Sequence, residues 1–195
     1  MKRFNITGTC YPEDHYMVDI SERLEIIAQM VERGDYFCIN AGRQYGKTTT
    51  LWALNRYLAA NYEVYSISFE GLADASYESE AKLAYAIIQQ FFMASMKKSN
   101  SASKPVQELV ENAFDKYEAS LQIELNQFSI LLTRMCKAAT RPLVLIIDEV
   151  DQASNYDSFI RLLGLLRSLY LRRERVATFQ SVILAGVYDI KNLKL

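Results

Sequence analysis

The segment Ala41-Gly-Arg-Gln-Tyr-Gly-Lys-Thr48 constrains the fold of this chain more than any other part of the sequence. A short apolar run, 36–40, precedes it and is typical of a buried strand. The following residues, 48–60, carry Leu51, Leu54 and Leu58 at the spacing of one helix face. Backbone N–H groups of such a loop can surround phosphate oxygens, and the helix N-terminus adds partial positive charge. The sequence therefore predicts a strand, a phosphate-binding loop and a helix.

Each part of this loop has an expected role in binding a nucleoside triphosphate. Lys47 supplies an ammonium group for the β- and γ-phosphates, and Thr48 supplies a hydroxyl ligand for Mg²⁺. Ala41 stands where such loops usually have their first glycine, and alanine fits there if the residue avoids positive φ. The predicted nucleotide-binding residues are Ala41, Gly42, Arg43, Gln44, Tyr45, Gly46, Lys47, Thr48 and Thr49.

A second motif follows, in which the apolar run Leu143–Ile147 ends in two consecutive carboxylates. A continuous run of Val, Ile and Leu is typical of a central parallel strand, and ligands bind at the carboxyl ends of such strands. Buried carboxylates are costly unless a cation or donor lies beside them. We therefore expect Asp148 to hold the metal. The expected catalytic residues are Glu149, which positions or deprotonates a water, and Lys47, which neutralises developing charge. The alternative is an ordinary buried strand that ends in a helix-capping acid. We expect Asp151, two residues further on, to cap the following helix.

Composition narrows the class of protein. A chain of 195 residues, 50% of them hydrophobic, can form one sizeable core, so we expect one domain over 1–195. A net charge of −1 does not support nucleic-acid binding, and no apolar run approaches the roughly 20 residues that span a membrane. Three scattered cysteines, Cys38 expected in the core, fit a cytoplasmic protein. The single histidine, His15, argues against a histidine-based metal site.

The remaining apolar patterns alternate between helical and strand periodicity. The expected helices are 22–33, 48–60, 77–94, 106–118, 121–139 and 156–172, and the expected strands are 36–40, 62–69, 143–148 and 181–185. This order predicts an α/β fold in which a parallel sheet has helices on both faces. Residues 70–140 form a largely helical insertion or crossover between the second and third strands.

These segments together resemble the AAA-like ATPases of bacteria and archaea, within the P-loop NTPase superfamily. The resemblance rests on Tyr16–Asp19, Tyr36–Thr50, Ile146–Asp151 and Ser181–Asp189. It implies a three-layer α/β/α sandwich, with ATP and Mg²⁺ as the ligands, and it places Tyr16–Val18 near the adenine. The Asn-Lys-x-Asp run that selects guanine is not in the sequence, which agrees with ATP.

The chain also departs from this family in three respects. Its relatives usually have a fifth strand beyond the first, so we expect this sequence to be truncated at the C-terminus, with its first strand at a sheet edge. Ala185, Gly186 and Val187 stand where a polar sensor residue is usual. No arginine is identified as the one that stabilises transition-state charge. The candidates are Arg43, Arg172, Arg173 and Arg175, and for the last three a solvated helix end is the alternative.

Two functions remain open on the sequence. The first is Mg²⁺-dependent ATP hydrolysis. The second is a nucleotide-dependent switch or scaffold with negligible turnover, which would act on another domain or subunit. A nucleic-acid motor has only family analogy in its favour.

Overall fold

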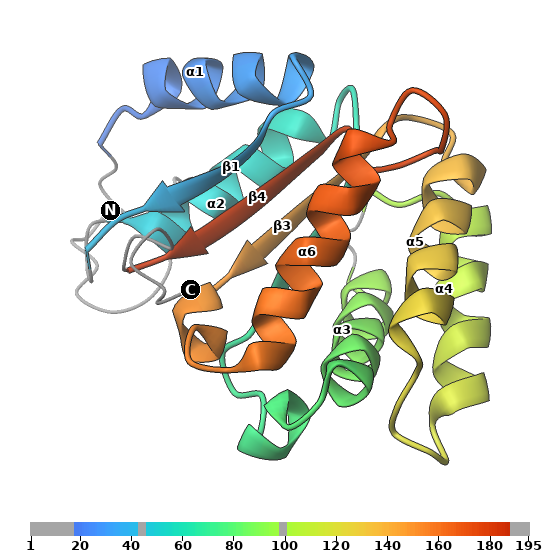
Figure 1. Ribbon diagram of the computed structural model, residues 1–195. Helices are drawn as coiled ribbons and strands as arrows, with labels where there is room; N and C mark the ends of the chain where they lie inside the picture. Colours follow the sequence, from blue (N-terminus) through green and yellow to red (C-terminus); the bar gives the residue numbers. More distant parts are fainter. Residues whose placement is uncertain (1–17, 43–45, 98–100, 188–195) are drawn as a thin grey trace.

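The computed structural model describes residues 18–42, 46–97 and 101–187. Within these ranges one parallel sheet has the strand order β1-β4-β3-β2, and β1 lies at an edge (Figure 1). The strands are β1 (Tyr36–Asn40), β2 (Glu63–Ser68), β3 (Leu143–Asp148) and β4 (Ser181–Gly186). All carboxyl ends therefore meet at the same edge of the sheet, where Lys47 and Asp148 lie.

Helices cover both faces of this sheet. The α-helices are α1 (Ser21–Glu32), α2 (Lys47–Leu58), α3 (Glu80–Ser95), α4 (Lys104–Tyr117), α5 (Leu125–Ala138) and α6 (Asp157–Leu171). Helices α1 and α2 pack on one face, and α3, α5 and α6 pack on the other, with α4 beside α3 and α5 (Figure 1). This arrangement confirms the predicted α/β/α sandwich of the P-loop type. Within the described ranges, no helix is both long and apolar enough to cross a bilayer.

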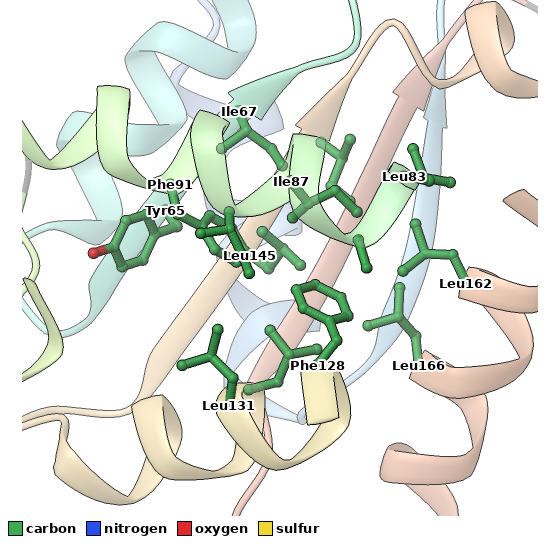
Figure 2. Packing of buried hydrophobic residues seen from close by; sticks show 14 of the residues in the cluster. Tyr65, Ile67, Leu83, Ile87, Phe91, Phe128, Leu131, Leu145, Leu162 and Leu166 are labelled. Carbon is green, nitrogen blue, oxygen red and sulfur yellow. The ribbon is translucent and has the colours of Figure 1, made fainter. Parts of the chain in front are cut away.

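Alternating residues of the strands divide the core into two clusters, because successive side chains of a strand point to opposite faces. In β3, Leu143, Leu145 and Ile147 belong to the larger cluster, and Val144 and Ile146 belong to the smaller one. Figure 2 shows the larger cluster, where the strands meet α3, α5 and α6; labelled there are Tyr65, Ile67, Leu83, Ile87, Phe91, Phe128, Leu131, Leu145, Leu162 and Leu166. Burial on both faces explains why β3 has no polar residue before Asp148.

The helix starts differ from the sequence prediction by one to four residues, most at α5, which begins at Leu125 rather than at 121. Helix α1 begins at Ser21 itself, and the backbone N–H of Ser21 donates to Oδ1 of Asp19 at 2.9 Å. The predicted helix 77–94 begins later, at Glu80, because a 3-10 turn, η1 (Asp74–Tyr77), precedes it. The cap of α3 is Ser79, whose hydroxyl accepts from the N–H of Lys82 at 3.2 Å. Capping by Ser79 fixes the helix start because it satisfies a backbone donor that has no partner in the helix.

The amino end of the sheet contains a buried carboxylate that no sequence motif indicated. Glu63 is 0% exposed and opens β2. It accepts hydrogen bonds from the backbone N–H and hydroxyl of both Ser103 and Thr140, and from the N–H of Arg141, at 2.7–3.2 Å. Burial raises the pKa of Glu63, but these hydrogen bonds outweigh burial and leave the pKa below its ordinary value. Glu63 thus joins β2 to the start of α4 and to the segment before β3.

Candidate functional site

The two sequence motifs meet at the carboxyl end of the sheet. Strand β1 leads into Ala41 and Gly42. The backbone N–H of Ala41 donates to the Gly186 carbonyl at 3.2 Å. Strand β3 ends at Asp148, and α2 begins at Lys47. The predicted residues Arg43, Gln44 and Tyr45 lie outside the described residues.

The start of α2 is suited to a negatively charged ligand. Gly46 precedes the helix with φ +74°, the left-handed conformation that glycine adopts without steric cost. Among the described residues no side chain caps this helix N-terminus. The partial positive charge of the first turn is therefore not offset by a capping carboxylate.

Lys47 joins both motifs through two ion pairs. Its Nζ lies 2.9 Å from Oδ1 of Asp148 and 2.6 Å from Oε1 of Glu149, although Glu149 is 102 residues away in the sequence. The Lys47 residue is only 8% exposed. Burial lowers the pKa of its ammonium, but the hydrogen bonds to Glu149 and Asp148 outweigh burial and hold the pKa above its ordinary value. The ion pair therefore places Lys47 and Asp148 at the same end of the sheet.

Glu149 adopts a backbone conformation that is uncommon for a side chain with a Cβ. Its φ is 54° and its ψ 38°, in the left-handed region, which costs roughly 1–2 kcal/mol for a residue other than glycine. The N–H of Glu149 donates to Oδ1 of Asp148 at 2.8 Å, so this oxygen contacts both Lys47 and the strained turn. The turn directs the Glu149 carboxylate toward Lys47.

Asp151 has a different role from the expected helix cap. Helix α6 begins only at Asp157 and has no side-chain cap, so the capping prediction was wrong. Instead, Oδ1 of Asp151 accepts the N–H of Val187 at 3.0 Å, just after β4. A Cβ on Gly186 would lie 2.8 Å from this oxygen, so glycine leaves the space that the contact needs. The segment after β3 is thereby tied to the end of β4.

A hollow of about 600 Å³ adjoins Lys47 between α1, β1 and α2. Apolar side chains line much of it, and its polar wall residues include Arg23 and Asn40. Thr48 is exposed at the start of α2, whereas Thr49 is half-buried. Val18, expected near the adenine, is 82% exposed, and Tyr16 lies outside the described residues. The structure thus offers space for a ligand larger than a phosphate beside Lys47.

Cys38 is exposed, so the prediction that it belongs to the core was wrong. The reason is the position of β1 at the edge of the described sheet. Hollows on both sides of β1 include Cys38 in their walls, one of them beside α6 and the other beside α1. The edge position expected for the first strand from the family resemblance thus agrees with the described sheet, whereas the local pattern of β1 alone predicted a buried Cys38.

The arginines after α6 lie at the opposite end of the sheet from Lys47. Nη1 of Arg173 donates to the Gly34 carbonyl at 3.0 Å, just before β1 begins. The guanidinium also lies 4.3 Å from the ring centroid of Tyr170. These contacts attach Arg173 to the amino end of β1, so within one chain it lies away from Lys47.

The fold and the Lys47 geometry define an α/β/α domain of the P-loop type. A family model described as "Predicted AAA-ATPase" matches residues 10–194, which include both motifs and all four strands. The chain belongs to this AAA-ATPase-like family, and the family indicates a nucleotide-binding ATPase. Comparison with curated proteins gave no match.

Proposed function

We propose that this domain binds ATP together with Mg²⁺ and hydrolyses the bond to the γ-phosphate. The observation that carries the proposal is the meeting of Lys47 with Asp148 and Glu149 at the start of α2. A cation and two carboxylates beside a helix N-terminus are the groups that phosphoryl transfer to water requires. Membership of the AAA-ATPase-like family supports the same class of reaction.

The phosphate-binding part would comprise the loop and the first turn of α2, with Lys47 as its charged side chain. The proposed nucleotide-binding residues are Ala41, Gly42, Arg43, Gln44, Tyr45, Gly46, Lys47, Thr48 and Thr49. The hollow beside Lys47 supports a place for the base and ribose against Ile27, Phe37 and Ile39. Arg23 and Asn40 would supply the polar contacts there.

The oxygen donors near Lys47 fit Mg²⁺. This ion prefers one or two protein oxygens, and takes the rest of its ligands from water and phosphates. The proposed Mg²⁺ ligands are Thr48 and Asp148. Thr48 is exposed at the start of α2, and the Asp148 carboxylate already faces a positively charged group. No cluster of three or more metal-binding side chains occurs in the described part of the chain, which agrees with a metal held partly by the nucleotide. Bound Mg²⁺ would neutralise charge that develops on the phosphates.

Glu149 would position the attacking water and accept its proton at a carboxylate oxygen. Its side chain is 24% exposed, so water can reach it. Lys47 would stabilise the charge on the transferred phosphoryl group, and these two residues are the proposed catalytic pair.

A nucleotide-dependent switch with little turnover is the second candidate, favoured by the position of Arg173. Its contact with Gly34 holds it away from Lys47, so Arg173 would supply transition-state charge only to the site of another subunit. In that case the isolated domain binds ATP and releases phosphate slowly.

The test combines calorimetric titration of ATP with Mg²⁺ and an assay of phosphate release. Lys47→Ala is expected to weaken ATP binding by about 100-fold, because a buried cation is lost from the phosphate site. Glu149→Gln is expected to retain binding and to lower turnover by about 100-fold or more. The controls are Lys104→Ala and Glu118→Gln, which make the same changes at exposed positions.

Each outcome decides between the candidates. Equal turnover of wild type and Glu149→Gln would remove Glu149 from catalysis. ATP binding without phosphate release would favour the switch. No binding to the wild type at millimolar ATP with Mg²⁺ would contradict both functions.

A further inference from the structure

The ammonium group of Lys47 is paired with two carboxylates. It has three N–H donors, and two carboxylates lie within 2.9 Å of Nζ. The Lys47 side chain is 7% exposed, so water contributes little to its solvation. The group that should attract phosphate is therefore occupied by Asp148 and Glu149.

Three contacts hold this arrangement together. The shorter ion pair, 2.6 Å, is the one with Glu149, and the longer, 2.9 Å, is the one with Asp148. The third contact is the hydrogen bond from the Glu149 N–H to Asp148 at 2.8 Å, which stabilises the left-handed turn. The same Asp148 oxygen thus stabilises the strained backbone of Glu149 and pairs with the Lys47 ammonium.

A ligand that arrives alone meets a penalty from this cluster. A polyphosphate can recruit Lys47 only by leaving two carboxylates without a cation, beside its own negative charge. A divalent cation alone can take the carboxylates only by displacing a buried ammonium, which it also repels. When both ligands bind, Lys47 can pair with phosphate while the metal pairs with a carboxylate. Each ligand therefore removes the penalty of the other, which is a reciprocal coupling between them.

We propose that the ion pairs of Lys47 with Asp148 and Glu149 form an autoinhibitory contact, which opens only when a polyphosphate and a divalent cation bind together. The proposal rests on the proposed function and adds a role for Glu149 before any nucleotide is bound. Before nucleotide binds, Glu149 restrains Lys47, and after Lys47 moves to the phosphate the same carboxylate is available to the attacking water.

The first test compares ATP in EDTA with ATP in Mg²⁺ by calorimetry. Wild type is expected to bind metal-free ATP at least about 50-fold more weakly than the metal complex. Glu149→Gln should strengthen binding of metal-free ATP by about 10-fold, because it removes the shorter ion pair. The matched control is Asp151→Asn, which removes the same charge in the same turn and retains an oxygen for the Val187 N–H.

The control separates release of Lys47 from simple loss of negative charge. Asp151→Asn should change the affinity for metal-free ATP by less than about threefold. An equal gain in Asp151→Asn and Glu149→Gln would overturn the autoinhibitory contact. Equal affinity of wild type for metal-free and metal-bound ATP would overturn it too, while leaving the proposed function intact. Failure of wild type to bind the metal complex would contradict the proposed function as well.

The second test needs no nucleotide and uses Mn²⁺ alone, followed by electron paramagnetic resonance. Lys47→Met keeps a long side chain and removes the ammonium from both carboxylates. We expect it to bind Mn²⁺ about 10-fold more tightly than wild type, whereas Lys104→Met at an exposed position should leave Mn²⁺ binding unchanged. Lys47→Gln is the second variant if circular dichroism shows that Lys47→Met does not fold. No gain in a folded Lys47 variant would overturn the proposal.

Discussion

Carboxylates at the two ends of the sheet are satisfied in opposite ways. At the amino end, Glu63 is fully buried and accepts hydrogen bonds from N–H and O–H groups of Ser103, Thr140 and Arg141. At the carboxyl end, the side chains of Asp148 and Glu149 are 14% and 24% exposed and share the ammonium of Lys47. Strands β2 and β3 run in parallel from one group to the other.

The difference lies in whether the partner can move. Three of the five donors to Glu63 are backbone N–H groups, and these are fixed by the fold. The Lys47 ammonium lies on a flexible stem and can change partners without unfolding the chain. A carboxylate with fixed neutral donors is therefore structural, and one with a movable cation is suited to ligand exchange. Burial alone does not distinguish the two.

The largest expected effect is at the amino end. Glu63→Ala leaves several buried donors without an acceptor, so the free energy of unfolding should fall by about 3–5 kcal/mol. Urea denaturation followed by circular dichroism measures the change. A loss below about 1 kcal/mol would show that water replaces the carboxylate, and the comparison between the two ends would fail.

Next in size is Gly186→Ala, at the carboxyl end. The new Cβ would lie 2.8 Å from Oδ1 of Asp151, so this side chain must move and its hydrogen bond to Val187 weakens. The free energy of unfolding should fall by about 1–3 kcal/mol in urea denaturation. An unchanged value would mean that Asp151 moves without loss, and would remove its role in fixing the turn after β3.

A smaller effect should appear in acid. The pKa of Glu63 is lower in the folded protein than the ordinary value of 4.5. The folded state therefore binds this proton less readily than the unfolded state, and the resulting stability is present above pH 4.5 and lost as the pH falls through the folded pKa. Urea denaturation at several pH values below 5 should show a shallower decline for Glu63→Gln than for wild type. Parallel declines would assign the acid sensitivity to other carboxylates.

The smallest effect serves as a reference away from both ends. Gly164 lies on the exposed side of α6, and a Cβ there would contact nothing within 4 Å. Gly164→Ala should raise the free energy of unfolding by about 0.5–1 kcal/mol, because alanine has the higher helix propensity. A decrease in stability, measured by thermal denaturation, would show that α6 does not tolerate a side chain at this position.

The sequence predicted the architecture because periodicity is a local property. Runs of apolar residues located β1 and β3 at the residues that the structure shows, and the rule for parallel strands placed Lys47 and Asp148 together. The catalytic and metal-binding roles of Lys47, Thr48, Asp148 and Glu149 stay predictions.

Other features depend on contacts between distant segments, and no local pattern encodes them. The donors to Glu63 lie 40 to 78 residues away in the sequence, so the residues near position 63 could not predict them. Cys38 is exposed because of the strand order, which the residues of β1 do not specify. The left-handed backbone of Glu149 results from the turn between β3 and the 3-10 helix η2 (Val150–Ala153), where a glycine would have been the recognisable signal.

In the proposed function, Lys47 exchanges its carboxylate partners for phosphate when the nucleotide binds. The most direct measurement is a crystal structure with Mg²⁺ and a non-hydrolysable ATP analogue. We expect the Lys47 ammonium to contact phosphate oxygens and to have left the 2.6 Å ion pair with Glu149. A bound analogue with Lys47 still paired to Glu149 would contradict it.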